Sequence, residues 1–327
     1  MRGVLAMTPT PSPLAVAVDL GGTHLRAALF TAEGAMLSRT RVRTEAEQGP
    51  DAVIERIADV VREVMGTAPG EAIMGIGVTA PGPVDEKRGV VASPPNLPGW
   101  ADVPLAERLQ ALLGLPVFLG NDANLAALGE YRYGAGKGLD DIIYITVSTG
   151  IGGGIISNGR LLTGAHGMAA EIGHMPIVPD GPLCGCGQRG HLEALASGPN
   201  IAREAEAALK RGWPSLLANH DGPLTAVEVV QAAQQGDATA RHVLARAGHY
   251  LGVGIALLVH VFNPQRIIVG GGVSNAGDFL LEPARQSARD HVMKPYRDTF
   301  DIVPAALGDD AGLYGAGALV FDTCSAG

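Results

Sequence analysis

The chain has 327 residues, of which 46% are hydrophobic, and a formal net charge of −9. No unbroken apolar run approaches the ~18 residues of a membrane span, and no run of Lys and Arg offers nucleic acid a basic surface. Three cysteines fit a reducing cytoplasm rather than a disulfide framework. The length predicts two domains of ordinary size, preceded by a proline-rich flexible tail at residues 1–13.

The first part of the chain reads as strands followed by alternating helices and strands. Short apolar runs bounded by glycine and polar residues predict the strands, and helical spacing of apolar residues after Pro50 predicts the first helix. The predicted order is strands at 14–19, 25–30 and 36–43, helix 51–65, strand 73–78, helix 105–113, strand 117–119 and helix 123–131.

A similar order follows in the second part. It contains strand 142–147, a return strand from Gly154 to Asn158, helices 200–211, 225–234 and 238–262, strand 266–269, helix 279–292, strand 301–304 and helix 313–321. Two αβ halves of this kind leave a cleft between them, which is a favoured place for a ligand. We expect a first domain at 1–121 and a second at 122–310, with a C-terminal helix at 311–325 that packs back on the first.

Two glycine-rich turns occupy equivalent places in these halves. The first is Asp19-Leu20-Gly21-Gly22-Thr23 and the second is Thr149-Gly150-Ile151-Gly152-Gly153-Gly154. Glycines after a strand let backbone N–H groups approach phosphate oxygens, Thr23 adds a hydroxyl, and Asp19 is placed to hold water on Mg²⁺. Either turn alone is also explained by an ordinary β-hairpin. The pair at matching places favours a nucleotide triphosphate between the halves.

A third glycine string, Gly270-Gly271-Gly272, follows a predicted strand and precedes a helix. It suits a base or ribose lying against the backbone. It is not GxGxxG, and no acidic residue follows at the distance that a dinucleotide site requires, so a Rossmann oxidoreductase is rejected.

The candidate acid–base residue is Asp122, in the string Gly120-Asn121-Asp122-Ala123-Asn124. It follows a strand and stands where the next helix begins, so an N-cap role explains it equally well from local sequence. A carboxylate at the cleft edge can instead take the proton of an attacking hydroxyl during phosphoryl transfer. Asn121 beside it suits a sugar hydroxyl, and Asn96 either forms an Asx turn or points into the cleft.

The segment from His166 to Glu193 carries a candidate metal site. Its four nitrogen and sulfur ligands are His174, Cys184, Cys186 and His191. Such a set, without a spare oxygen ligand, predicts a closed tetrahedral Zn²⁺ site with no open catalytic position. The alternative is two inert loop cysteines and two surface histidines.

Taken together and in order, these strings resemble the ROK family of repressors, open reading frames and sugar kinases, and most of all its bacterial glucokinases. The strings that carry the resemblance are Asp19–Thr23, Ala80–Asp85, Asn96–Trp100, Asn121–Asn124, Thr149–Gly154, Glu171–His174 and Cys184–Glu193. The resemblance runs from about Leu14 to the C-terminus. It implies an α/β actin-like ATPase (ribonuclease H-like) fold with two αβ domains flanking a cleft and a zinc-binding insertion at 166–193 in the second.

The resemblance also implies roles for single residues. Asp122 corresponds to the general base that acts on the sugar 6-hydroxyl, and Asn96, Asn121, Glu171, His174 and Glu193 correspond to residues that hold sugar hydroxyls. The two glycine turns correspond to the phosphate motifs of an ATP and Mg²⁺ site, and Gly270–Gly272 to its adenosine side. His174, Cys184 and Cys186 match zinc ligands, whereas His191 stands where the commoner family pattern has a third cysteine.

Several alternatives stay open at this point. Family repressors carry an N-terminal helix-turn-helix, for which about 13 proline-rich residues leave little room. Kinases for fructose, mannose, N-acetylmannosamine and N-acetylglucosamine share most of these strings. We expect a cytoplasmic ATP-dependent glucokinase that forms a homodimer or homotetramer, with polyphosphate as the alternative phosphate donor.

Overall fold

The computed structural model describes residues 13–325, so all but the last residue of the predicted tail lies outside the described residues. The chain divides into two compact units. Unit 1 contains residues up to 125 together with those from 312, and unit 2 contains residues 126–311. The strands and helices that the sequence predicts are all present, most of them with ends within two residues of those expected.

Unit 1 is built on a five-stranded sheet with the order β3-β2-β1-β4-β7. The strands are β1 (Leu14–Leu20), β2 (His24–Thr31), β3 (Met36–Arg43), β4 (Ile73–Ala80) and β7 (Val117–Asn121). β1, β2 and β3 form an antiparallel meander, whereas β4 pairs parallel with both β1 and β7. The carboxyl ends of β1, β4 and β7 therefore meet at one edge of the sheet, and this edge carries Asp19 and Asn121.

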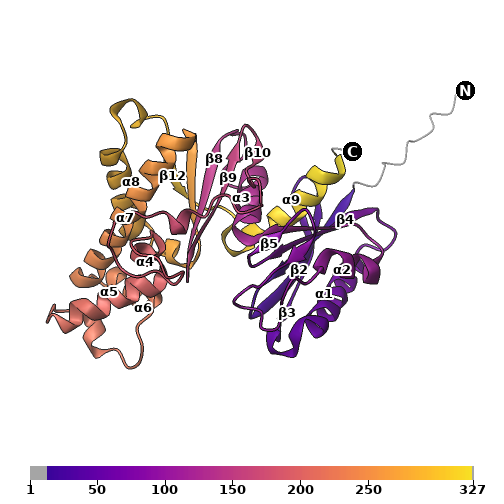
Figure 1. Ribbon diagram of the computed structural model, residues 1–327, viewed down its shortest axis with the longest axis horizontal. Helices are drawn as coiled ribbons and strands as arrows, with labels where there is room; N and C mark the ends of the chain where they lie inside the picture. The colour runs from indigo at the N-terminus through magenta and orange to yellow at the C-terminus, as the bar shows by residue number, and fades with distance from the viewer. Residues whose placement is uncertain (1–12, 326–327) are drawn as a thin grey trace, which may run out of the picture. The chain divides into compact units, whose positions relative to one another are not determined.

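Helices cover both faces of this sheet (Figure 1). The amphipathic helix α1 (Gly49–Met65) buries Val53, Ile54 and Ile57 against one face, next to α2 (Leu105–Leu113). The C-terminal helix α9 (Ala311–Ser325) lies on the other face. There, a Cβ on Gly77 of β4 would come within 1.9 Å of the Ala316 carbonyl oxygen, so only glycine permits this approach. A two-stranded hairpin, β5 (Val84–Asp85) and β6 (Val90–Val91), which the sequence did not predict, lies near β7.

The sheet of unit 2 repeats the strand order of unit 1. Its order is β10-β9-β8-β11-β12, with β8 (Ile142–Val147), β9 (Ile151–Ser157), β10 (Arg160–Leu161), β11 (Arg266–Gly270) and β12 (Asp301–Pro304). β8 and β9 are antiparallel as β1 and β2 are, and β11 pairs parallel with β8 and β12. The two glycine turns thus join equivalent strand pairs, which confirms that the halves are similar.

The extent of the second glycine turn was predicted wrongly. Gly152, Gly153 and Gly154 belong to β9, where they pair with Thr146, Ile145 and Tyr144. A Cβ on Gly153 would lie 2.2 Å from Cδ1 of Ile172, so the small side chain serves close packing rather than a turn. Only Ser148–Gly150 connects the two strands.

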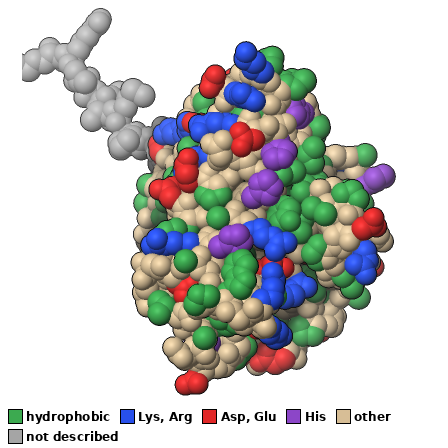
Figure 2. Space-filling view, turned by 90° about the vertical axis from the view of Figure 1, so that its left-hand side faces the viewer, with side chains coloured by type: hydrophobic (Ala, Val, Ile, Leu, Met, Phe, Trp, Pro, Cys, Tyr) green, Lys and Arg blue, Asp and Glu red, His purple; other side chains and the backbone are tan. Residues whose placement is uncertain are grey.

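The helices of unit 2 pack largely against one another and against one face of its sheet (Figure 1). They are α4 (Glu193–Ala196), α5 (Gly198–Lys210), α6 (Ala226–Gln234), α7 (Ala238–Phe262) and α8 (Asp278–His291). The helix α3 (Asp122–Tyr133), which begins in unit 1, contributes no residue to this buried cluster. α7 is long and apolar enough to cross a membrane, but 61% of that stretch is buried inside the fold, as in an ordinary core helix. Seen from one side, the molecule shows hydrophobic side chains interspersed with charged ones and several histidines (Figure 2).

Candidate active site

The glycine turn of unit 1 joins β1 to β2 and is held from two sides. The N–H of Gly21 donates to the His24 carbonyl at 3.0 Å, and the Thr44 hydroxyl donates to the Gly21 carbonyl at 2.6 Å. A Cβ on Gly22 would lie 2.8 Å from the Asn96 carbonyl oxygen, so the turn lies directly against the loop that carries Asn96. The structure therefore brings Gly21, Gly22 and Asn96 together.

Asp19, at the end of β1, is paired with Arg26 across the hairpin. The two residues are opposite each other in the β1–β2 register, and the Arg26 Nε lies 2.8 Å from the Asp19 Oδ2. The Arg26 Nη2 contacts the same oxygen. Arg26 was not predicted as a site residue, although its place seven residues after Asp19 in a tight hairpin puts the two side chains on one face of the sheet.

The prediction that Asp122 stands at an N-cap is wrong by one residue. Helix α3 begins at Asp122, and the Oδ1 of Asn121 accepts the N–H of Ala123 at 3.0 Å, which is the capping hydrogen bond. The Asp122 Oδ1 also accepts this N–H, at 2.8 Å, and the Asp122 side chain is exposed. Because Asn121 already supplies the cap, helix capping does not by itself explain a carboxylate at position 122.

Four predicted metal ligands of unit 2 lie together. Their ligand atoms are all within 4.8 Å of one another, with the Cys184 Sγ 3.8 Å from the His174 Nδ1 and the Cys186 Sγ 3.2 Å from the His191 Nδ1. Metal–ligand bonds of about 2.3 Å for sulfur and about 2.0 Å for nitrogen put neighbouring tetrahedral ligands about 3.5 Å apart. The four side chains therefore fit one Zn²⁺ ion, and His191, which is only 9% exposed, faces the cluster.

The protonation of Cys184 reflects its buried position. Burial raises the pKa of the thiol, the backbone N–H of Cys186 lowers it, and the Cys186 side chain and the Glu193 carboxylate raise it again. The net effect is a raised pKa, so metal binding at this cluster must release a proton from Cys184. The other ring nitrogen of His174, Nε2, lies 4.0 Å from a carboxylate oxygen of Glu171.

Glu193 connects the metal cluster to the second glycine turn. Its Oε1 lies 3.6 Å from the Cys184 Sγ, and its Oε2 accepts the backbone N–H of Ile151 at 3.0 Å. Its own carbonyl accepts a hydrogen bond from the Asn200 Nδ2 at 2.6 Å. Side chain and backbone of Glu193 are thus both fixed within unit 2.

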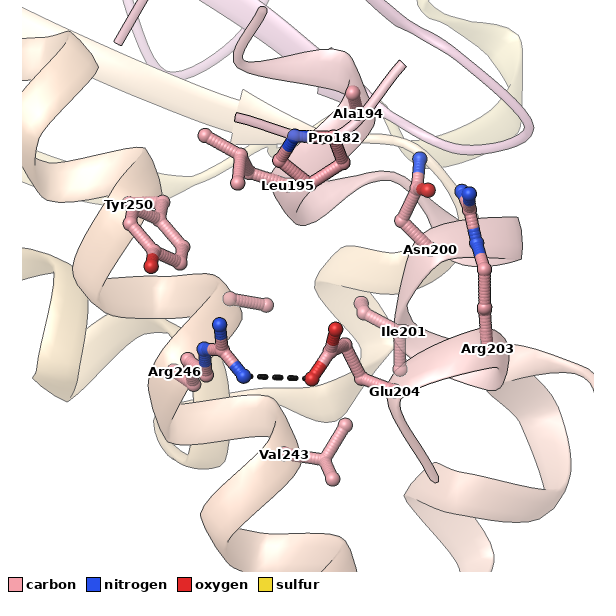
Figure 3. A pocket seen from close by; sticks show the side chains of 11 residues that line it. Pro182, Ala194, Leu195, Asn200, Ile201, Arg203, Glu204, Val243, Arg246 and Tyr250 are labelled. Carbon is pink, nitrogen blue, oxygen red and sulfur yellow. Dashed lines mark hydrogen bonds and ion pairs between the residues drawn. The ribbon is translucent and has the colours of Figure 1, made fainter. Parts of the chain in front are cut away.

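Asn200 also lines a small cavity of about 70 Å³, together with Ala194 and Leu195 of α4 (Figure 3). An ion pair of 2.6 Å between Arg246 and Glu204 lies across this cavity. The Tyr250 hydroxyl also hydrogen-bonds to Arg246. This hydrogen bond raises the pKa of the Arg246 guanidinium. These contacts hold α5 against α7, and the cavity is too small for a nucleotide.

A larger hollow, of about 680 Å³, opens beside the Ser148–Gly150 turn. This volume is typical of sites for nucleotides and drug-sized ligands. Its walls come from the turn, the start of α5, the helix α6 and the loop after β11, and its lining residues are Ser148, Thr149, Gly198, Pro199, Ala202, Leu224, Thr225, Ala226, Val227, Val230, Gln231, Gln234, Gly272, Val273 and Asn275. Thr149 and Gly272, predicted for phosphate and adenosine, share this hollow.

The other two glycines of the third string serve packing. A Cβ on Gly270 would lie 2.5 Å from the Tyr144 hydroxyl oxygen, and one on Gly271 would lie 2.4 Å from the Val147 carbonyl oxygen. Gly271 also has a φ of 84°, which favours glycine. Of the string, only Gly272 is among the lining residues of the hollow.

Each unit therefore gathers its own share of the predicted site. Unit 1 holds the Asp19–Thr23 turn, Asn96, Asn121 and Asp122, whereas unit 2 holds the hollow, the metal cluster, Glu171 and Glu193. The α6 side of the hollow was missed. Its residue Val227 has an apolar side chain that is 58% accessible, and this exposure can be seen only in the folded chain.

Comparison with known proteins agrees with this arrangement. The model of the ROK family matches residues 15–323. The chain is 40% identical to the glucokinase of Thermotoga maritima, over 93% of this chain and 96% of that protein. It is 36% identical to the N-acetylmannosamine kinase of Shigella boydii serotype 18, over 93% of this chain and 97% of that protein.

A solved structure is similar throughout. The ROK family glucokinase from Streptomyces griseus in complex with glucose and AMPPNP superposes with a TM-score of 0.78 at 39% identity, covering 94% of this chain and 99% of that one. Family model, sequence identity and fold all span nearly the whole chain, and on these grounds it belongs to the ROK family.

Proposed function

We propose that this chain is an ATP-dependent hexose kinase that phosphorylates glucose at its 6-hydroxyl to give glucose 6-phosphate. The observation that carries this proposal is the exposed carboxylate of Asp122 at the first position of α3, beside an asparagine that already makes the capping hydrogen bond. The resemblance to glucokinases over 93% of the chain supports glucose as the acceptor. A coupled kinase assay across a panel of hexoses and phosphate donors tests the proposal.

Asp122 acts as the general base in this mechanism. Its carboxylate accepts the proton of the glucose 6-hydroxyl while that oxygen forms a bond to the γ-phosphorus of ATP. The bond between the γ-phosphorus and the bridging oxygen breaks, and the electron pair leaves with ADP. The protonated Asp122 then returns its proton to solvent, which completes the balance.

The phosphate groups are assigned to the two glycine turns. Backbone N–H groups at Gly22, Thr149 and Gly150 are suited to hold phosphate oxygens, whereas that of Gly21 already donates to the His24 carbonyl and shapes the turn. The hollow beside Thr149 offers room for the adenosine. Asp19, with Arg26 beside it, is the carboxylate that would hold Mg²⁺ through water. When bound, Mg²⁺ neutralises charge on the transferred phosphoryl group.

The sugar hydroxyls are assigned to five side chains. They are Asn96 and Asn121 of unit 1 and Glu171, His174 and Glu193 of unit 2. Carboxylates and amides are suited to this task because they pair with hydroxyl donors in directions that distinguish one hexose from another. The Glu193 carboxylate already has two protein contacts, so its orientation is set before sugar binds.

The four ligands His174, Cys184, Cys186 and His191 are assigned to a structural Zn²⁺. The ion would do no chemistry on the phosphate. It would fix the loop around His174 and Glu193, with the His174 Nδ1 toward the metal and its Nε2 toward Glu171 and the sugar. Two thiolates and two neutral imidazoles balance the charge of Zn²⁺, whereas the three-cysteine pattern commoner in the family carries one extra negative charge.

Other acceptors of the same class remain testable alternatives. N-acetylmannosamine is the strongest of them because relatives that carry this name are 36% identical to the chain. A preference of kcat/KM for glucose over N-acetylmannosamine in the hexose panel separates the two. A regulator without kinase activity would bind sugar yet show no turnover. Polyphosphate as donor, a homodimer or homotetramer and a cytoplasmic location stay predictions for assay, light scattering and fractionation.

A further inference from the structure

Glu86 is a half-buried carboxylate in unit 1 to which the mechanism above gives no task. It follows the short strand β5 and lies beside the turn between β7 and α3. Its Oε1 is 3.5 Å from the backbone nitrogen of Asn121, at the long end of the hydrogen-bond range. The side chain of Asn124 donates a second hydrogen bond to the same carboxylate.

These two contacts bracket the proposed base. Asn121 precedes Asp122 and Asn124 follows it by two residues, so one carboxylate holds the first turn of α3 on both sides of position 122. Asn124 is only 2% exposed, and its Oδ1 has no partner among the described residues. The buried Asn124 side chain therefore has the Glu86 carboxylate as its hydrogen-bond partner.

The loop that carries Glu86 also packs closely on Asn121. A Cβ on Gly82 would lie 2.9 Å from the Asn121 Nδ2. Burial raises the pKa of the Glu86 carboxyl, and the hydrogen bonds from Asn121 and Asn124 lower it in part, with a raised pKa as the net result. A carboxyl group that is buried at a cost in solvation free energy is a candidate for a functional role.

We propose that Glu86 is a positioning residue for phosphoryl transfer, which orients the Asp122 carboxylate by holding Asn121 and Asn124. The inference rests on the proposed function, in which Asp122 is the base. A positioning role for Glu86 differs from a purely structural role in one respect. Loosening the first turn of α3 misdirects the base, so the chemical step slows even in chains that are fully folded.

The experiment compares Glu86→Ala, Glu86→Gln and the control Lys87→Ala, which alters the exposed neighbour. Each variant is assayed well below its Tm for kcat, for the KM of ATP and of glucose, and for glucose affinity by calorimetry. For Glu86→Ala we expect a kcat lower by about 10- to 100-fold, because small misplacements of a catalytic group have effects of this size. The KM of ATP should stay within about twofold, and glucose affinity should fall by less than kcat.

Rescue by the conservative variant is the second readout. Gln keeps an acceptor oxygen for Asn121 or Asn124, so Glu86→Gln should retain kcat within about fivefold of the natural chain. A folded Glu86→Ala with unchanged kcat would overturn the inference, as would equal losses in the Ala and Gln variants. If Glu86→Ala does not fold, Asn124→Ala removes the other partner and should show the same fall in kcat at constant ATP KM; an unchanged kcat there contradicts the inference.

A failure of the Glu86 proposal can be distinguished from a failure of the proposed function. If the natural chain phosphorylates glucose and the Glu86 variants behave like Lys87→Ala, only the positioning role fails. If the natural chain and all variants lack hexose kinase activity, the proposed function fails first.

Discussion

The carboxylate of Glu193 accepts the backbone N–H of Ile151 at 3.0 Å, so one side chain joins the loop of the His/Cys cluster to the turn between β8 and β9. The same carboxylate lies 3.6 Å from the Cys184 Sγ. A Cβ on Gly150 would come within 2.6 Å of its Oε2, so glycine at that position leaves room for the carboxylate as it lies. Because the turn also borders the large hollow, Glu193 links the residues proposed for sugar to those proposed for nucleotide in unit 2.

Substitutions of Glu193 should separate its contact with the Ile151 N–H from its proposed contact with the sugar. Glu193→Gln keeps an acceptor for Ile151 but loses the charge offered to sugar, so the KM of glucose should rise by about 10- to 100-fold, as for a lost charged hydrogen bond. The KM of ATP should stay within about twofold. Glu193→Ala also releases the turn, so the KM of ATP should rise as well. Glu206→Ala on α5 is the control, and steady-state kinetics that show identical effects for Gln and Ala would contradict the linkage.

The metal site predicts one Zn²⁺ per chain. Elemental analysis of the purified protein should find about one equivalent, and His191→Ala should lower both zinc content and Tm, because metal binding and folding are linked. Cys324→Ser, which alters the cysteine outside the cluster, should change neither. Full zinc retention in His191→Ala would remove His191 from the ligand set, and a zinc-free natural chain would remove the site.

Periodicity predicted most of the fold. Apolar runs located the strands of both sheets, and helical spacing located α1 and α7, since burial imposes these patterns directly. Gly152 and Gly153 were misplaced because glycine marks a turn in most local contexts, whereas here Ile172, distant in the sequence, packs over the strand. That contact exists only in the folded chain.

The site was predicted less completely than the fold. The four metal ligands are near one another in sequence, and the structure brings them together as expected. Arg26 was overlooked although it lies in the same hairpin as Asp19. Val227 and Glu86 carry no local sequence signal, because the hollow and the α3 turn are assembled from elements that are far apart in the chain.

The hollow beside Thr149 can be tested by filling it. Val227→Trp adds bulk to an exposed lining residue, so the KM of ATP should rise at least about tenfold while the KM of glucose stays within about twofold. Val261→Trp on α7 makes the same change at an exposed valine outside the hollow and should leave both values unaltered. Equal ATP kinetics in the two variants would argue against the hollow as the nucleotide site.

Asp237, whose side chain caps the N-terminus of α7, should make an acid-sensitive contribution to folding. Burial alone would raise its pKa, but hydrogen bonds from the N–H groups of Ala240 and Leu216 and from the Ser215 hydroxyl outweigh this, so the pKa is lowered from 3.8. The stabilisation is therefore present above the unfolded pKa and is lost as pH falls through the lower folded value.

Asp237→Asn should accordingly be less stable than the natural chain by about 1–2 kcal/mol near pH 7, as for a weakened helix cap. The difference in unfolding free energy between the variant and the natural chain should shrink below about pH 4, where the aspartate of the unfolded natural chain becomes protonated. Urea unfolding at several pH values measures it. A difference that grows as the pH falls would contradict the assignment.

Glucose phosphorylation with Asp122 as the base is tested by one comparison of Asp122→Asn with the natural chain. Both are assayed with glucose and ATP in a coupled assay and titrated with glucose by calorimetry. The kcat of the variant should be lower by about 10²- to 10⁴-fold, with glucose affinity retained within about fivefold. A kcat near that of the natural chain would contradict the role of Asp122, and a natural chain without turnover on glucose would contradict the proposed activity.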